Sequence, residues 1–420
     1  MPFRKTVTRC VLATLLVLLT SLAAPLAGAA PDTPPTTPPA APSTPPAAPA
    51  SPPVPEIKAK NAVLLDAISG RTLWSKDAEE RVQPASLVKL MTLKLAYETL
   101  AQGKIKAGDL VNVSTRAWQT GGSRMFLQVG SKVSVEDLIK GVSVVSGNDA
   151  CIALAEFIGG TVENFVVTMN KRAQELGLAN THYADPHGIS HENYTTAADT
   201  GKLAWLYVRD HPESLAIHST KEFTYTPEGG RPITQQNRNR LLGQYKGADG
   251  LKTGHTENAG YNLVATAQRD GTRFFVVTMG LQARTEPLGE QQRAEEAGRI
   301  LDYAFAGFNT ITLVSKGEQF ATSRVWKGAA NEVPVGAAEE VKYTVSKGSE
   351  GAATRSVSLS SPVVAPVRKG QVLGSSTVTV PGGEPLTVKL VALKDVGPGS
   401  LLKRMLDALR LLFQRSVKVE

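Results

Sequence analysis

Residues 84–96, Pro-Ala-Ser-Leu-Val-Lys-Leu-Met-Thr-Leu-Lys-Leu-Ala, decide the fold around which the rest of the chain is arranged. Apolar side chains fill nearly every position after Ser86, which predicts a helix that is buried on all sides. Pro84 ends the preceding element, and Gly103 ends the helix. A buried helix needs a sizeable core, and a content of 42% hydrophobic and 20% charged residues is typical of a globular protein.

Ser86 and Lys89 form an S-x-x-K pattern, and this spacing places both side chains on one helix face. A serine hydroxyl becomes a nucleophile when a nearby base takes its proton. Lysine is such a base only if burial or a neighbouring cation keeps it neutral. Ser400 and Lys403 have the same spacing, so the pair alone does not distinguish a nucleophile from a helix cap.

Two further motifs follow in the chain. Ser146 and Asn148 form S-x-N in a predicted turn between helices, where a hydroxyl can relay a proton and an amide can hold both a substrate carbonyl and a lysine ammonium. Residues 252–254 form K-T-G at the entrance to a strand predicted over residues 261–267. Lysine there adds positive field, and Gly254 leaves room for a substrate backbone at the strand edge. A helix cap and a solvent-facing turn remain the alternatives.

The N-terminal region predicts export. Basic residues precede an apolar run over residues 11–22 and an A-x-A-like site at residues 27–29, which favours a cleaved signal peptide over residues 1–29, with an uncleaved anchor as the alternative. Twelve prolines lie between positions 31 and 55. Residues 30–55 are therefore predicted to form an extended spacer, with a recognition element as the alternative. Cleavage removes Cys10 and leaves Cys151, which excludes an internal disulfide.

The order of patterns predicts an α/β catalytic domain over residues 56–307. A hairpin is expected around the Ser69-Gly70 turn, then several helices, then a second hairpin around residues 269–271, and a final helix over residues 290–306. Residues 308–396 are rich in Val, Thr, Ser and Gly and lack helix signals, which predicts a small all-β domain.

The C-terminal segment, residues 400–415, is predicted to be an amphipathic helix that begins at Ser400. Its apolar stripe and basic opposite face favour a helix lying on a membrane surface. The alternative is a helix packed on the β domain. A formal net charge of +8 fits an anionic membrane or polymer and does not by itself argue for nucleic acid.

The three motifs in this order resemble the penicillin-binding protein and serine β-lactamase superfamily. Residues 84–92, 146–151 and 249–256 are similar to the low-molecular-mass D-alanyl-D-alanine carboxypeptidases, the penicillin-binding protein 5 and 6 group. The similarity covers about residues 56–415. It implies a penicillin-binding-protein-like catalytic domain with an antiparallel sheet and helices, the all-β domain and the C-terminal helix.

The resemblance also implies the reaction, which is removal of the terminal D-alanine from peptidoglycan pentapeptide stems. Ser86 would form the acyl-enzyme with Lys89 as general base, Ser146 would pass the proton to the departing D-alanine, and Asn148 would bind the substrate amide. The enzyme would need no cofactor and no metal. β-Lactams would be covalent inhibitors, and the inner membrane would be a partner on its periplasmic face.

The resemblance assigns the remaining positions to substrate binding. Lys252 and Thr253 would hold the terminal carboxylate region, and the backbone N–H groups of Ser86 and His255 would form the oxyanion hole. Arg238 matches a position that supports carboxylate recognition, although a surface arginine is the commoner case.

The sequence also contains a histidine cluster and leaves alternative functions open. His182, His187 and His191 suggest a metal cluster, but Pro186 and Gly188 argue for a turn beside the cleft. Three functions remain as alternatives: a serine β-lactamase, which would use a glutamate in an E-x-x-L-N stretch that residues 149–250 lack, a D,D-endopeptidase, and a non-catalytic wall-binding protein.

Overall fold

The computed structural model describes residues 53–416 except Gly382, and side chains as far as Leu412. The predicted signal peptide and nearly all of the proline-rich spacer lie outside the described residues.

A five-stranded antiparallel sheet forms the centre of the N-terminal half, in the order β2-β1-β9-β8-β7. Its strands are β1 (Asn61–Asp66), β2 (Thr72–Lys76), β7 (Ala248–Thr256), β8 (Gly260–Arg269) and β9 (Thr272–Leu281). Both predicted hairpins are confirmed, because β1 pairs with β2 and β8 pairs with β9. Asp270 and Gly271 connect β8 to β9 with φ values of +47° and +79°, as a tight hairpin turn requires.

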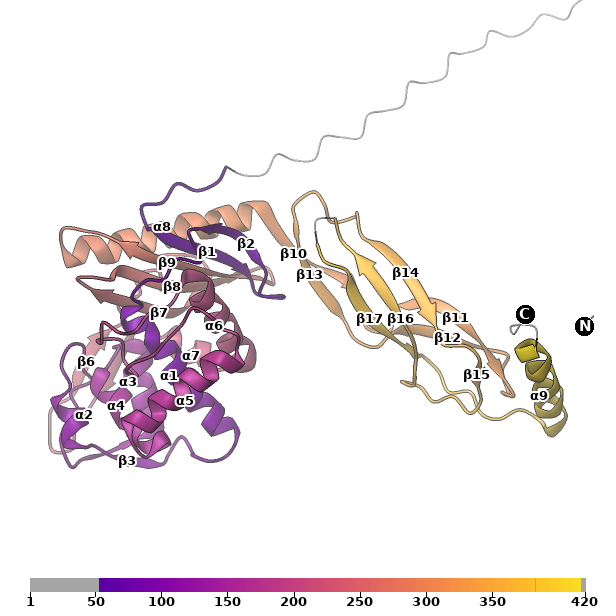
Figure 1. Cartoon of the computed structure of the whole chain (residues 1–420), viewed down its shortest axis with the longest axis horizontal. Coiled ribbons are helices and arrows are strands. Elements are labelled where there is room, and N and C mark those ends of the chain that lie inside the picture. The colour runs from indigo at the N-terminus through magenta and orange to yellow at the C-terminus, as the bar shows by residue number, and fades with distance from the viewer. Residues whose placement is uncertain (1–52, 382, 417–420) are drawn as a thin grey trace, which may run out of the picture. The chain divides into compact units, whose positions relative to one another are not determined.

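Both faces of this sheet are covered. Successive residues of β1 alternate between two cores, so that Ala62 and Leu64 pack against α8 (Glu286–Gly307), whereas Val63 and Leu65 face the other helices. Figure 1 shows α8 along one side of the sheet and the remaining helices of this half on the other. The predicted α/β class is confirmed, with the sheet as the middle layer.

The helical layer contains α1 (Lys89–Ala101), α2 (Thr115–Gln119), α3 (Val135–Val144), α4 (Asn148–Gly159), α5 (Val162–Glu175), α6 (Ala197–Asp210) and α7 (Ser214–His218). The strand pairs β3 (Leu110–Asn112) with β4 (Lys132–Ser134) and β5 (Glu222–Tyr225) with β6 (Ile233–Gln236) lie between them in sequence. Sequence patterns did not predict α6. Its signal was the Thr196 cap, whose hydroxyl accepts the Asp199 N–H.

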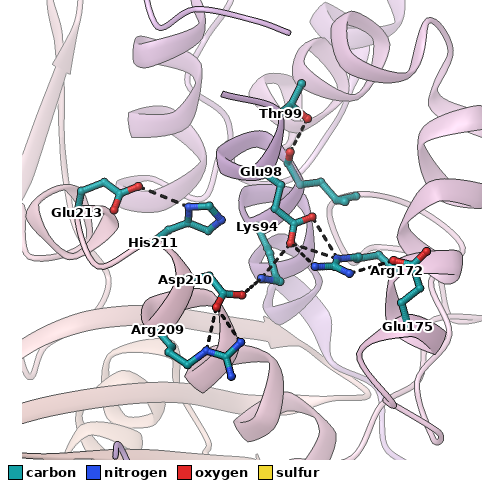
Figure 2. A network of polar contacts seen from close by, with 10 residues as sticks. Lys94, Glu98, Thr99, Arg172, Glu175, Arg209, Asp210, His211 and Glu213 are labelled. Atoms are coloured by element: carbon teal, nitrogen blue, oxygen red, sulfur yellow. Dashed lines mark hydrogen bonds and ion pairs between the residues drawn. The ribbon is translucent and has the colours of Figure 1, made fainter. Parts of the chain in front are cut away.

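A network of charged side chains ties α1 to two of its neighbours, as Figure 2 shows. Lys94 is completely buried, and its Nζ lies 2.9 Å from Asp210 Oδ2 on α6 and 3.0 Å from Glu98 Oε1 on α1. Arg172 on α5 donates to the same Glu98 at 2.8 Å. The network fixes the middle of the helix whose first residue is Lys89.

Residues 308–396 contain strands and no helix among the residues that the structure describes there, as predicted. The strands are β10 (Phe308–Val314), β11 (Gln319–Trp326), β12 (Glu332–Ala337), β13 (Val341–Ser346), β14 (Thr354–Leu359), β15 (Val363–Val364), β16 (Val372–Thr379) and β17 (Leu386–Ala392). β10 pairs with β13, and the other six form one sheet. Two clusters of valines and leucines fill this domain.

The C-terminal helix α9 (Leu401–Ser416) is present where the sequence predicted it. Its polar side contacts the β domain: Asp407 is buried and accepts the Lys327 N–H at 2.7 Å, and Lys403 Nζ donates to Gly328 O at 2.6 Å. The basic face is exposed at Arg404 and Arg410, but Lys403 reaches back to the domain. On the apolar side Met405 and most of the leucines are exposed.

Candidate active site

Ser86 lies in a single 3₁₀ turn, η1 (Ala85–Val88), that leads directly into α1. Side chains three residues apart eclipse each other in such a turn, and Lys89 Nζ lies 2.9 Å from Ser86 Oγ. Ala85 has a φ of +49°, which is uncommon for a residue with a side chain. The structure thus brings the predicted pair together, on a tighter turn than the regular α-helix expected from the sequence.

Lys89 is completely buried and has an environment suited to a neutral amine. Its second polar contact is the His187 carbonyl oxygen at 2.6 Å. Among the described residues no carboxylate lies within ion-pair distance of its nitrogen. Burial lowers the pKa of Lys89. A neutral amine can donate an N–H to His187 O and accept the Ser86 hydroxyl proton with its lone pair.

The Asp185–Gly188 turn holds that carbonyl in place. The Asp185 carboxylate accepts the backbone N–H of His187 at 2.9 Å and of Ser190 at 2.6 Å. Gly188 has a φ of +93°, and a Cβ at this position would overlap the carbonyl oxygen of Ala85. The predicted turn beside the cleft is therefore part of the wall behind the nucleophile.

Ser146 lies in the turn between α3 and α4, where the S-x-N pattern predicted a turn, and Asn148 is the first residue of α4. Ser146 Oγ and Asn148 Oδ1 are buried, and neither has a hydrogen-bond partner among the described residues. Asn148 Nδ2 donates to Gly121 O at 2.7 Å. No described hydrogen bond joins Asn148 to a lysine, so its open group is the acceptor oxygen. Buried polar atoms without partners in a cleft suit a substrate that supplies them.

The K-T-G motif lies inside a strand of its own, β7, and not at the entrance to the strand predicted over residues 261–267. β7 runs from residue 248 to 256 and is the edge strand beside β8. Lys252 is 2% exposed, so the alternative of a solvent-facing turn is also wrong. The alternation of apolar residues that reveals β8 is missing from residues 248–256, which explains why the strand escaped notice.

Lys252 places a second buried amine in the site. Its Nζ donates to the Thr253 carbonyl at 3.0 Å. Burial lowers the pKa of Lys252 well below its usual range, and the charge of Lys89 lowers it further. A charge on Lys89 therefore disfavours protonation of Lys252.

Gly254 allows β7 to approach the nucleophile. A Cβ there would lie 3.0 Å from Pro84 O and 3.1 Å from Ser86 N, which is tighter than normal packing. The sequence predicts that this glycine makes room for substrate. The structure shows that it also allows close contact with the turn that carries Ser86.

His255 and Arg238 lie at the mouth of the site. The imidazole of His255 is exposed and stacks on Tyr261 at 4.0 Å between ring centroids. Burial and the nearby Arg293 lower the pKa of His255. Arg238 lines the cavity, but its side chain is 47% exposed and its Nη1 lies 3.3 Å from Glu286.

Part of the predicted set, including Arg238 and His255, lines one small cavity together with other residues. The cavity has a volume of about 50 Å³, and Ser86, Ser146 and Thr253 line it. Ser123 and Arg293 also line it. Asn148 N donates to Ser123 O at 2.8 Å, which holds the Gly121–Arg124 loop against the S-x-N turn.

Arg293 is the main residue that sequence reasoning missed. It is 3% exposed, and it donates to Arg238 O at 3.1 Å and to Gly254 O at 3.5 Å. Burial lowers its pKa to about 10, so it stays a cation at neutral pH. The available signal was an arginine beside the inward positions of the predicted last helix.

Cys151 is a buried residue of α4, as expected, and no described disulfide includes it. Burial raises the pKa of its thiol to about 12, so the thiol remains protonated and unreactive at neutral pH. The Cys151 side chain lies close to both buried lysines. A negative charge on it would raise the pKa of Lys89 and of Lys252.

Comparisons with known proteins agree with this geometry. Residues 47–283 match the family described as D-alanyl-D-alanine carboxypeptidase, and residues 308–398 match the C-terminal domain of penicillin-binding protein 5. The chain is 38% identical to the D-alanyl-D-alanine carboxypeptidase DacC of Escherichia coli over 370 residues, which are 86% of this chain and 90% of the relative.

A second relative and a solved structure give the same picture. DacF of Bacillus subtilis, a D-alanyl-D-alanine carboxypeptidase, is 36% identical over 80% of this chain and 85% of its own length. The crystal structure of penicillin-binding protein 5 from Haemophilus influenzae is similar with a TM-score of 0.69 and 38% identity, and covers 82% of this chain and 99% of that one.

Proposed function

Because the chain belongs to the D-alanyl-D-alanine carboxypeptidase family, we propose that it releases the terminal D-alanine of peptidoglycan pentapeptide stems through an acyl ester on Ser86. The chain is a serine-type D-alanyl-D-alanine carboxypeptidase of the penicillin-binding protein 5 and 6 type, and an exported cell-wall enzyme. It takes peptide substrates and binds β-lactams. The roles of its individual residues are the proposal.

One observation carries the assignment of the nucleophile. Lys89 Nζ lies 2.9 Å from Ser86 Oγ, is completely buried, and has no carboxylate beside it among the described residues. A buried lysine without a counter-ion prefers to be neutral, and a neutral lysine within hydrogen-bond distance of a hydroxyl is placed to act as its base.

The proton follows a path between the three polar motifs. Lys89 takes the proton of Ser86 Oγ as the oxygen attacks the carbonyl carbon between the two D-alanines. The backbone N–H groups of Ser86 and His255 receive the negative charge that develops on the carbonyl oxygen. Lys89 passes this proton through the Ser146 hydroxyl to the departing amine, and water then hydrolyses the ester and regenerates Ser86.

Substrate binding uses groups in and beside the cavity. The open Oδ1 of Asn148 accepts an N–H of the peptide. Lys252, Thr253 and Arg238 hold the terminal carboxylate region, and the buried Arg293 adds positive field behind it.

The decisive assay compares two substrates. Purified residues 56–396 are incubated with a pentapeptide stem and, separately, with a cephalosporin. We expect free D-alanine with slow cephalosporin turnover. Rapid cephalosporin hydrolysis without release of D-alanine would favour a β-lactamase, and cleavage of cross-linked dimers in preference to stems would favour an endopeptidase.

A labelling experiment tests the nucleophile itself. Fluorescent penicillin should label the wild-type chain and fail to label Ser86→Ala. Ser400→Ala is the matched control, because Ser400 shares the S-x-x-K spacing and lies outside the site. Persistent labelling of Ser86→Ala would move the nucleophile elsewhere.

We propose the domain limits and the anchor together. Residues 56–307 form the catalytic domain, residues 308–396 the C-terminal β domain, and residues 400–415 a helix on the periplasmic face of the inner membrane, after a signal peptide at residues 1–29 and a spacer at 30–55. Among the described residues no single helix is long and apolar enough to span a bilayer.

The exposed face of α9 supports the anchor. Leu401, Leu402 and Met405 are 73%, 69% and 60% exposed, whereas Lys403 and Asp407 on the polar side of the helix contact the β domain. A docked polar side and an open apolar side suit insertion into the headgroup region. Deletion of residues 398–420 should release the protein from membranes and leave D-alanine release intact, whereas unchanged retention would refute the anchor.

A further inference from the structure

His218 is a buried titratable group that the proposed mechanism does not use. It is the last residue of α7, it is completely buried, and both ring nitrogens have partners. Nδ1 lies 3.0 Å from the carbonyl oxygen of Leu251, and Nε2 lies 3.2 Å from the hydroxyl of Tyr207.

The partners determine the state of the ring. Burial lowers the pKa of His218 to about 4, so the imidazole is neutral at neutral pH. A carbonyl oxygen only accepts, so Nδ1 carries the hydrogen and donates it to Leu251 O. Nε2 is then an acceptor, and the Tyr207 hydroxyl donates to it. This assignment leaves each hydrogen with one partner.

Leu251 immediately precedes Lys252 in β7. β7 is an edge strand of the sheet, so it pairs with a neighbouring strand, β8, on one side only. Side chains hold two consecutive carbonyls of β7: His218 donates to Leu251 O, and Asn239 Nδ2 donates to Gly250 O at 3.0 Å. These two bonds replace the missing neighbour just before the K-T-G motif.

Tyr207 connects the same histidine to the helix of the nucleophile. Its ring meets that of Tyr97 edge-on, with 5.7 Å between centroids, and Tyr97 lies on α1, which begins at Lys89. Contacts among buried groups therefore run from α1 through Tyr207 and His218 to the residue before Lys252.

We propose that His218 is a positioning residue of the active site, which holds Lys252 and Thr253 in register opposite Ser86 and Lys89 by fixing the Leu251 carbonyl. This proposal rests on the proposed function. It assigns no chemical step to His218, which acts by holding other residues of the site in place. Its donor at Nδ1 sets the strand, and its acceptor at Nε2 only fixes which nitrogen carries the hydrogen.

Two substitutions separate the two ring nitrogens. In His218→Asn, the amide N–H takes the place of Nδ1–H and can still donate to Leu251 O. In His218→Gln, the amide reaches the position of Nε2, keeps the Tyr207 contact and leaves Leu251 O without a donor. Both variants remove the ring, so both lose packing, and they differ in which bond remains.

We expect His218→Gln to slow acylation by fluorescent penicillin at least about tenfold relative to His218→Asn, because small misplacements of binding groups are costly in rate. The melting temperatures of the two should be similar. Equal acylation rates for the two variants, or rates that simply follow their melting temperatures, would overturn the proposal.

A neighbouring histidine provides the control. His211 is also buried and lies against Tyr97 and Tyr207, at 5.6 Å and 6.3 Å between ring centroids, but it has no described contact with β7. His211→Asn should lower the melting temperature and leave acylation within about twofold, since it removes packing and the 3.5 Å contact with Glu213 but no described contact with β7. A loss of acylation like that of His218→Gln would also overturn the proposal.

Tyr207→Phe tests the proposal even if both His218 variants fail to fold. It keeps the ring in the core and removes the hydroxyl that fixes the hydrogen on Nδ1. We expect this variant to fold and to slow acylation several-fold. The KM for the pentapeptide substrate should not change. An unchanged acylation rate would count against the assignment. Loss of labelling in the wild-type chain would instead contradict the proposed nucleophile.

Discussion

Helix α1 carries two lysines that solvent does not reach, five residues apart, and they are stabilised in opposite ways. Lys94 lies 3.0 Å from Glu98 and 2.9 Å from Asp210 (Figure 2). Lys89 meets a hydroxyl and a carbonyl, at 2.9 Å and 2.6 Å. Burial is the same for both, and the groups opposite the nitrogen differ.

The difference shows what turns a buried lysine into a base. Carboxylates beside Lys94 compensate the cost of burying a charge, so that lysine can remain an ion and brace the fold. Beside Lys89 nothing compensates that cost, so the neutral form is favoured. Cavity size does not identify the site, since a cleft of about 660 Å³ borders the Lys94 network and the site cavity has about 50 Å³.

The largest effect is expected at the lysine without a counter-ion. Lys89→Met should slow acylation by fluorescent penicillin about 10³-fold, since general-base catalysis contributes 10²–10⁴. The melting temperature should change little, because no buried carboxylate loses its partner. Acylation within tenfold of wild type would show that another group takes the Ser86 proton.

Lys94→Met should have the converse result. Glu98 and Asp210 each lose a charged hydrogen-bond partner, so the free energy of unfolding should fall by about 2 kcal/mol, measured by urea denaturation. Acylation of the folded protein should stay within about threefold. Lys104→Met, at an exposed position of the same cleft, is the control and should change neither quantity.

A carboxylate added beside Lys89 should make it resemble Lys94. Cys151→Asp places a negative charge near Lys89 and should raise the pKa of that lysine. The base is then neutral only at higher pH, so the acid limb of the pH–rate profile should move upward by about one unit. Cys151→Asn is the uncharged control. A limb that moves equally in both variants would mean that charge is not the cause.

Arg238→Gln should have the smallest effect. The side chain is half exposed and already faces Glu286, so we expect KM for a substrate with a free terminal carboxylate to rise about fivefold, close to 1 kcal/mol. An amidated substrate should not show the change. Arg240→Gln is the control, because Arg240 pairs with Glu290. The assignment fails if both substrates respond alike to Arg238→Gln.

Much of the fold and part of the site could be predicted from the sequence. The pattern around Ser86 predicted a buried helix, and the two hairpins, the all-β segment and α9 followed from alternation, turns and amphipathic spacing. Family resemblance gathered Ser86, Ser146 and Lys252 into one site. These features depend on local patterns or on short motifs in a fixed order.

Other features depend on contacts between distant segments. The sequence gives only part of the difference between Lys94 and Lys89, because Glu98 lies four residues from Lys94 but Asp210 is 116 residues away. Arg293 and His218 each act through a partner from another element, and β7 lacks an alternating pattern. Such residues become recognisable only when the chain brings the segments together.

The closeness of two glycines to the nucleophile constrains how the gene can vary. A methyl group at Gly188 would overlap the carbonyl oxygen of Ala85, and one at Gly254 would lie 3.1 Å from Ser86 N, which is tighter than normal packing. Selection for D-alanine release from a library randomised at these two codons should therefore recover glycine at both. Resistance to β-lactams arising within this chain would have to come from substitutions elsewhere in the site.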